Sequence, residues 1–133
     1  MTVATPGSST TGADVVDLRV PADPAYLAVV RSTTAGLAAR LDLTLDEIED
    51  MRIAVDEACA LVMSRQAQPG AALHAAFTVG SDALEVVVDG PAGSLPERGN
   101  FAWSVLEALV ATVETGRCRT GSWIRLIQPA RRR

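Results

Sequence analysis

Residues 43–66, LTLDEIEDMRIAVDEACALVMSRQ, are the stretch that decides the fold of this chain. Thr44 is followed three residues later by Glu47, and at this spacing each side chain can bond the backbone N–H of the other residue. Behind this capping box, apolar residues recur at helical spacing. They form one stripe: Ile48, Met51, Val55, Cys59 and Val62. The stretch therefore predicts a long helix over 45–66 with one buried face.

The same helix carries a carboxylate between apolar neighbours. Glu57 stands four residues after Ile53 and four before Leu61, on a face that also holds Ala54 and Ala60. If that face is covered, the desolvated carboxylate becomes a better proton acceptor. The spacing fits a partly exposed structural glutamate equally well. Glu57 is therefore a candidate catalytic residue, with a purely structural role as the alternative.

Length and composition narrow the class of protein. The chain has 133 residues, 48% of them apolar and 21% charged, which is typical of one globular domain with a real core. A net charge of −4 argues against general nucleic-acid binding. Cys59 and Cys118 lack metal-ligand spacing, which favours a reduced, cytoplasmic protein. No leader pattern and no apolar run of membrane-spanning length is present, so we expect no membrane association.

The remaining periodicity predicts a two-layer α+β domain. Strands are expected at 16–20, 73–79, 84–88 and 122–128, and helices at 25–41, 45–66 and 101–113. This order suggests a mixed, mostly antiparallel sheet of four or five strands with the helices on one face. We expect residues 14–129 to form the domain, between a disordered tail at 1–13 and a basic tail at 130–133.

A second motif follows the strand that ends at Val88. Asp89 is a strand-end acid that can accept a hydrogen bond from an adenine amino group, and glycines such as Gly93 let a ligand approach the backbone. Gly99 stands shortly before the helix at 101–113, whose first N–H groups would attract an anion. Read without context, the same residues also fit ordinary turns.

These segments together resemble a known family. RIAVDEACALVMSR, residues 52–65, is similar to the first conserved helix of the RsbW/SpoIIAB anti-sigma factors, which are histidine-kinase-like ATPases. The family pattern there is an apolar pair, then Glu, then Asn four residues later, and often His after four more. Glu57 matches the Glu, whereas Leu61 and Arg65 occupy the Asn and His positions. The metal-binding half of the motif is absent.

The resemblance extends to the second half of the chain. Asp89 and Gly93 match the D-x-G-x-G motif, with Pro91 replacing its first glycine. The segment FAWSVLEAL, at 101–109, is similar to the helix that follows the family's glycine-rich lid, and 120–122 resembles its last small-residue element. The resemblance covers about residues 15–128 and is nearest to the actinobacterial branch, which implies the fold of the Bergerat type.

Family membership would imply two activities. Such proteins bind an alternative sigma factor and keep it from core RNA polymerase, without contacting nucleic acid directly. They also use Mg-ATP to phosphorylate a Ser or Thr of a STAS-fold anti-anti-sigma factor. By resemblance Glu57 is the general base, Asp89 reads adenine, Gly93 and Gly99 approach the nucleotide, and Gly121 with Ser122 lines its far side. No residue is assigned to a metal.

The missing Asn bears on which activity survives. Phosphoryl transfer needs a metal to neutralise developing charge. Between Asp46 and Glu57 stand six acids and one base, which disfavours a triphosphate without a metal ligand. Asp56 or Ser64 could replace the ligand, although Asp56 lies about a quarter-turn from Glu57. The sequence thus favours sigma binding with weak or lost ATP binding and kinase activity.

Two alternatives stay open. One is an active serine/threonine kinase of the RsbW type with altered metal ligation. The other is a small interaction protein that kept only the fold. The sequence identifies neither the sigma factor nor its antagonist, and it leaves a homodimer open.

Overall fold

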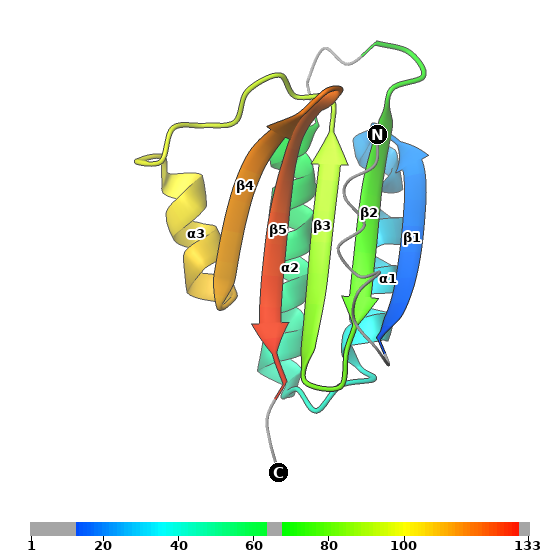
Figure 1. Ribbon diagram of the computed structural model, residues 1–133, viewed down its shortest axis with the longest axis vertical. Helices are drawn as coiled ribbons and strands as arrows, with labels where there is room; N and C mark the ends of the chain where they lie inside the picture. The colour runs from blue at the N-terminus through cyan, green and yellow to red at the C-terminus, as the bar shows by residue number, and fades with distance from the viewer. Residues whose placement is uncertain (1–12, 64–67, 131–133) are drawn as a thin grey trace.

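The structure is a computed structural model that describes residues 13–63 and 68–130. Figure 1 shows the elements in space. In chain order they are β1 (Asp14–Pro21), the 3-10 turn η2 (Pro24–Tyr26), α1 (Leu27–Ala38), α2 (Leu45–Val62), β2 (Ala72–Val79), β3 (Ala83–Gly90), α3 (Phe101–Leu109), β4 (Thr112–Cys118) and β5 (Gly121–Pro129). Of the two predicted tails, residues 1–12 and 131–133 lie outside the described part of the chain.

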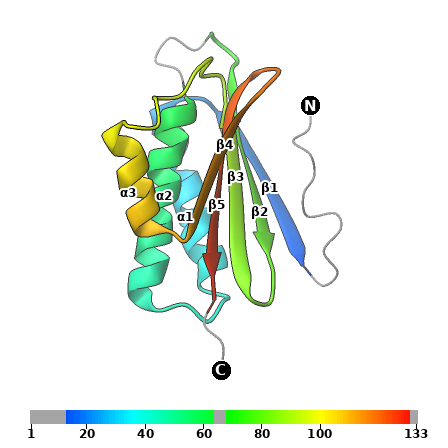
Figure 2. The same cartoon turned by 60° about the vertical axis from the view of Figure 1, so that its left-hand side comes forward.

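The strands form one sheet in the order β1-β2-β3-β5-β4. Every neighbouring pair is antiparallel, so the sheet is not mixed. Figure 2 shows the three α-helices together on one face of the sheet, with α3 next to β4. The predicted α+β sandwich with helices on one face is confirmed. No helix among the described residues is long and apolar enough to cross a membrane.

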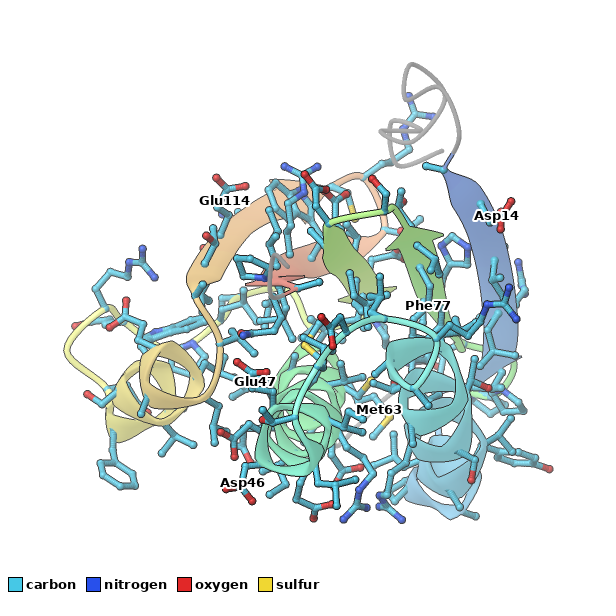
Figure 3. The ribbon with its side chains drawn as sticks, turned by 90° about the horizontal axis from the view of Figure 1, so that it is seen from below. Asp14, Asp46, Glu47, Met63, Phe77 and Glu114 are labelled. Atoms are coloured by element: carbon cyan, nitrogen blue, oxygen red, sulfur yellow. The ribbon has the colours of Figure 1, made fainter. Side chains whose placement is uncertain are left out.

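The core lies between the sheet and the helices. Because side chains alternate across a strand, every second residue of β2, β3 and β5 points into it. Phe77 of β2 is seen in this position in Figure 3, viewed from below. The strand residues that are fully buried in this core are Leu73, Ala75, Phe77, Leu84, Val86, Val88, Ile124 and Leu126. Helix α2 supplies Met51, Val55, Cys59 and Val62, all with no exposed surface.

Helix α2 begins as its sequence predicts. The Glu47 N–H donates to Thr44 Oγ1 at 3.1 Å, and the Thr44 N–H donates to Glu47 Oε1 at 2.8 Å, so the capping box is complete. The apolar stripe behind it is buried, except that Ile48 is only partly so. Burial raises the pKa of the Cys59 thiol to about 12, and this thiol is therefore a neutral core group at physiological pH.

Both long helices end earlier than predicted. Helix α1 starts after the 3-10 turn and ends at Ala38 rather than at 41. Helix α2 ends at Val62, since Met63 is already extended, with φ −84° and ψ 137°. The predicted continuation through 64–66 lies outside the described residues. The end of α2 has a tertiary cause, because the Val62 carbonyl accepts the N–H of Ala92 at 2.8 Å.

The predicted helix at 101–113 is wrong in its second half. Helix α3 ends at Leu109, Val110 is extended, and 112–118 form strand β4, which pairs with β5. Gly116 lies inside this strand beneath the indole of Trp123, where a Cβ would overlap the ring. The β-branched residues of this segment favour a strand once a pairing partner is available.

The capping box provides a test of the fold. Thr44→Ala removes the acceptor of a helix N-terminal N–H, and we expect it to lower the free energy of unfolding by about 1 kcal/mol in urea denaturation. Thr33→Ala is the matched control, because the Thr33 hydroxyl donates only to the Val29 carbonyl within α1. We expect this control to stay within about 0.5 kcal/mol of the wild type. Equal losses in the two variants would contradict the role of the capping box.

Candidate functional site

A hollow of about 600 Å³ opens between the end of α2 and the loop that joins β3 to α3. Among the residues that the structure describes, the side chains that line it are apolar except that of Ser94, and backbone N–H and C=O groups form much of the remaining surface. The lining residues are Ala60, Leu61, Met63, Ala92, Gly93, Ser94, Leu95 and Pro96. Leu61, at the position that the family pattern gives to Asn, thus faces this hollow together with Gly93 of the second motif.

Glu57 lies one turn before Leu61 on the same side of α2. The face around it is open, because Ile53 is 42% exposed and Ala60 is exposed. Glu57 itself is only partly buried. The described residues therefore leave this face partly open to solvent, and the catalytic role of Glu57 stays a prediction. Its proximity to the hollow is the remaining argument for a catalytic role.

The wall of the hollow is closed by tight backbone packing. The Ala92 N–H donates to the Val62 carbonyl at 2.8 Å, and the buried Ser122 Oγ donates to the Ala92 carbonyl at 2.7 Å. A Cβ on Gly90 would lie 2.5 Å from the Val62 oxygen, and one on Gly121 would overlap the Gly90 oxygen. Gly121 and Ser122 therefore hold the start of the loop against the end of α2.

The rest of the loop is anchored as well. Arg117 of β4 donates to the Gly93 carbonyl at 3.0 Å, and the Trp103 indole N–H donates to the Pro96 carbonyl at 2.9 Å. At its end the Asn100 N–H donates to the Glu97 carbonyl at 2.8 Å. These hydrogen bonds anchor the loop at several points, so we expect it to be less mobile than an unanchored loop.

Gly93 and Gly99 are both exposed. A Cβ at either position would meet no atom within 4 Å, and neither residue has a positive φ. Packing therefore does not require glycine at these positions, which leaves both open to a close approach by a ligand.

Asp89 lies on the other face of the sheet. Val88 points into the core, so Asp89 points away from the helices. Its Oδ2 is 3.2 Å from Nδ1 of His74, whose Nε2 is 3.4 Å from Oδ1 of Asp17. A second hollow of about 650 Å³ opens there, lined by Arg19 and Thr120 among others. The structure thus places Gly93 in the lining of the first hollow and Gly121 with Ser122 behind the start of its loop, whereas the Asp89 side chain lies on the other face of the sheet.

The sequence analysis missed His74. The predicted hairpin could have revealed it, because strands at 73–79 and 84–88 joined by a short turn place residue 74 opposite residue 89, the register that is observed. The position of Asp89 does not support the adenine-reading role that the resemblance implies, and that role stays a prediction.

The residues around the hollow do not fit a metal-bound triphosphate. The described residues of its lining contain no carboxylate, carboxamide or imidazole, which are the ligands that hold Mg²⁺ or position it. Asp56, one alternative ligand, is paired with Arg31 at 3.0 Å, and Ser64 lies outside the described residues. Among the residues that the structure describes, no group of three or more His, Cys, Asp or Glu could hold a metal ion.

Comparison with known proteins defines the class. The model of the family "Histidine kinase-like ATPase domain" matches residues 20–127, most of the chain. The chain therefore belongs to the histidine kinase-like ATPase family. A crystal structure of the RsbU and RsbW domains of a Mycobacterium tuberculosis protein has the same fold, with a TM-score of 0.66 and 15% identity over 90% of this chain and 33% of that one.

Within this class, the chain is similar to RsbW. It is 41% identical over 78 residues to the serine-protein kinase RsbW of Bacillus subtilis, covering 57% of this chain and 49% of that protein. Identity to RsbW of Bacillus velezensis is 39% over 80 residues, covering 59% and 50%. The chain thus spans about half the length of these relatives. The resemblance to the RsbW type is confirmed.

Substitution of two glycines tests whether tight backbone packing closes the wall of the hollow. Gly121→Ala places a Cβ against the Gly90 carbonyl, so we expect a loss of about 1–3 kcal/mol in the free energy of unfolding. Gly93→Ala, where the added Cβ meets no atom, should change this free energy by less than about 0.5 kcal/mol. Urea denaturation of both variants measures the difference. If Gly121→Ala is as stable as Gly93→Ala, the described closure is incorrect.

Proposed function

We propose that this protein is an anti-sigma factor that binds and sequesters an alternative sigma factor, with Mg-ATP binding and kinase activity weak or lost. The observation that carries the proposal is the apolar hollow, with Leu61 at the position that the family pattern gives to the metal-binding Asn. The similarity to RsbW supports sigma binding as the retained activity. In this proposal the protein acts in the cytoplasm by protein contact and does not touch DNA.

The charge distribution supports the loss of nucleotide binding. In the described part of the chain, Asp46, Asp50 and Glu57 of α2 have no ion-pair partner. The nearby guanidinium of Arg117 is bound to the Gly93 carbonyl, and that of Arg98 lies 5.5 Å from the centre of the Trp103 ring. Among the described residues, a triphosphate would therefore meet uncompensated negative charge, and the arginines near the hollow are already engaged.

A second candidate function is the kinase itself. Its support is that the relatives are named serine-protein kinase RsbW, and that Glu57 lies one turn from the hollow. In this alternative Glu57 takes the proton of a Ser or Thr on a STAS-fold anti-anti-sigma factor. Gly93, Gly99, Gly121 and Ser122 would surround the nucleotide, and Asp89 would have to leave His74 to read adenine.

Sigma binding has a direct test. Co-expression with each stress-type sigma factor of the host, followed by affinity capture and size-exclusion chromatography at about 150 mM salt, should yield a stable complex with one of them. The complex should form without added nucleotide and persist with a non-hydrolysable ATP analogue. Size-exclusion chromatography of the protein alone reports whether it is a homodimer. Absence of a complex with every sigma factor would exclude the anti-sigma function.

Nucleotide binding can be tested by restoring at position 61 the Asn of the family pattern. Leu61→Asn places a side-chain oxygen one turn from Glu57, and we expect Mg-ATP to bind about tenfold more tightly, or ~1.4 kcal/mol, in calorimetric titration. Leu61→Ala is the matched control, because it shortens the side chain without adding an oxygen. Thermal midpoints of both variants verify folding.

The wild type should bind Mg-ATP weakly and transfer phosphate slowly or not at all to a STAS-fold partner in a radiolabel assay. Rapid transfer by the wild type that Glu57→Gln abolishes would instead establish the active kinase.

A further inference from the structure

We infer that the outer face of α2 and the hollow at its end form one docking surface for a basic amphipathic helix of a partner protein. The inference rests on the proposed function only in that the sigma factor is the expected partner. The docking surface and the chemistry of the partner segment are what it adds to that function.

The surface is continuous along one helix. At about 100° per residue, six side chains of α2 fall within an arc of about 100°. These side chains are Asp46, Asp50, Ile53, Glu57, Ala60 and Leu61, and all are at least partly exposed. Figure 3 shows Asp46 on the side of α2 that faces away from the sheet. The strip is about 22 Å long, which a partner helix of about four turns would cover.

The negative charge of this surface favours a basic partner. Asp46, Asp50 and Glu57 have no ion-pair partner in the described part of the chain, whereas Arg31 of α1 and Arg52 of α2 are engaged elsewhere. Arg52 is paired with Glu49 one turn away, and Arg31 holds Asp56. A segment with Lys or Arg along one side would complement the acidic strip, accelerate association and disfavour acidic competitors.

The hollow provides the apolar end of the surface. Ala60 and Leu61 form its border with α2, and its other lining residues come from Met63 and from the anchored loop 92–96. Because that loop is fixed by the bonds at Ala92, Gly93 and Pro96, the hollow exists before a partner arrives. A Leu, Met or Phe of the partner would bury apolar area there at little ordering cost, which is the usual anchor of a tight interface.

The test blocks the hollow without disturbing the core. Ala60→Arg adds a long side chain at an exposed helix position that lines the hollow. Ala28→Arg is the matched control, at an exposed position of α1 outside the surface. Affinities are measured by fluorescence anisotropy for the captured sigma factor, and separately for a labelled synthetic helix of about 18 residues with a Lys stripe and a terminal Leu. Thermal midpoints establish that both variants fold.

We expect Ala60→Arg to weaken both interactions at least about tenfold and Ala28→Arg to leave them within about twofold. Asp46→Asn combined with Asp50→Asn should weaken binding and reduce its dependence on salt. If the sigma factor binds but Ala60→Arg and Ala28→Arg behave alike, the surface is wrong while the proposed function stands. If no sigma factor binds but the synthetic helix binds with the expected losses, the proposed function fails and the surface stands. Displacement of the helix by Mg-ATP at equal concentration would assign the hollow to nucleotide and overturn the inference.

Discussion

One backbone hydrogen bond, from the Ala92 N–H to the Val62 carbonyl, joins the parts on which the candidate site depends. This bond lies where α2 ends and the β3–α3 loop begins. It requires these two segments to approach closely, which the absence of a side chain at Gly90 allows. Ser122 extends the same link by donating to the Ala92 carbonyl. The wall of the hollow is thus built from three segments that are far apart in the sequence, and a buried amide and two carbonyls are satisfied in the process.

These hydrogen bonds restrict the conformation of the β3–α3 loop. With its start fixed by Ala92 and its middle held at Gly93 and Pro96, the segment has little freedom to fold over a ligand. In the proposed function the apolar side chains of the lining and the acidic face of α2 act together, disfavouring a metal-bound triphosphate and favouring a basic segment with an apolar anchor. The chain thus has the fold of its family, and the proposed loss of kinase activity rests on the residues offered at this hollow.

The sequence was informative where its signals are local. The capping box at Thr44 and the buried stripe of α2 were both predicted, as were the alternating strands and the placement of the helices on one face. It failed at the end of α3, where the helix predicted to run to 113 ends at Leu109 and residues 112–118 form a strand. It also gave no sign that Asp89 contacts His74 across the β2–β3 pair.

What the sequence determined by itself is the helix around which the domain forms, because a capping box and an apolar stripe depend on residues within four positions of one another. Three features were decided only by tertiary structure: the end of α2, the strand at 112–118 and the face to which Asp89 points. Each depends on a partner distant in the chain: Ala92 for Val62, β5 for β4, and the sheet register for Asp89. Such contacts form only after the intervening chain has closed into a loop, which costs conformational entropy. A pattern of neighbouring residues therefore does not reveal them.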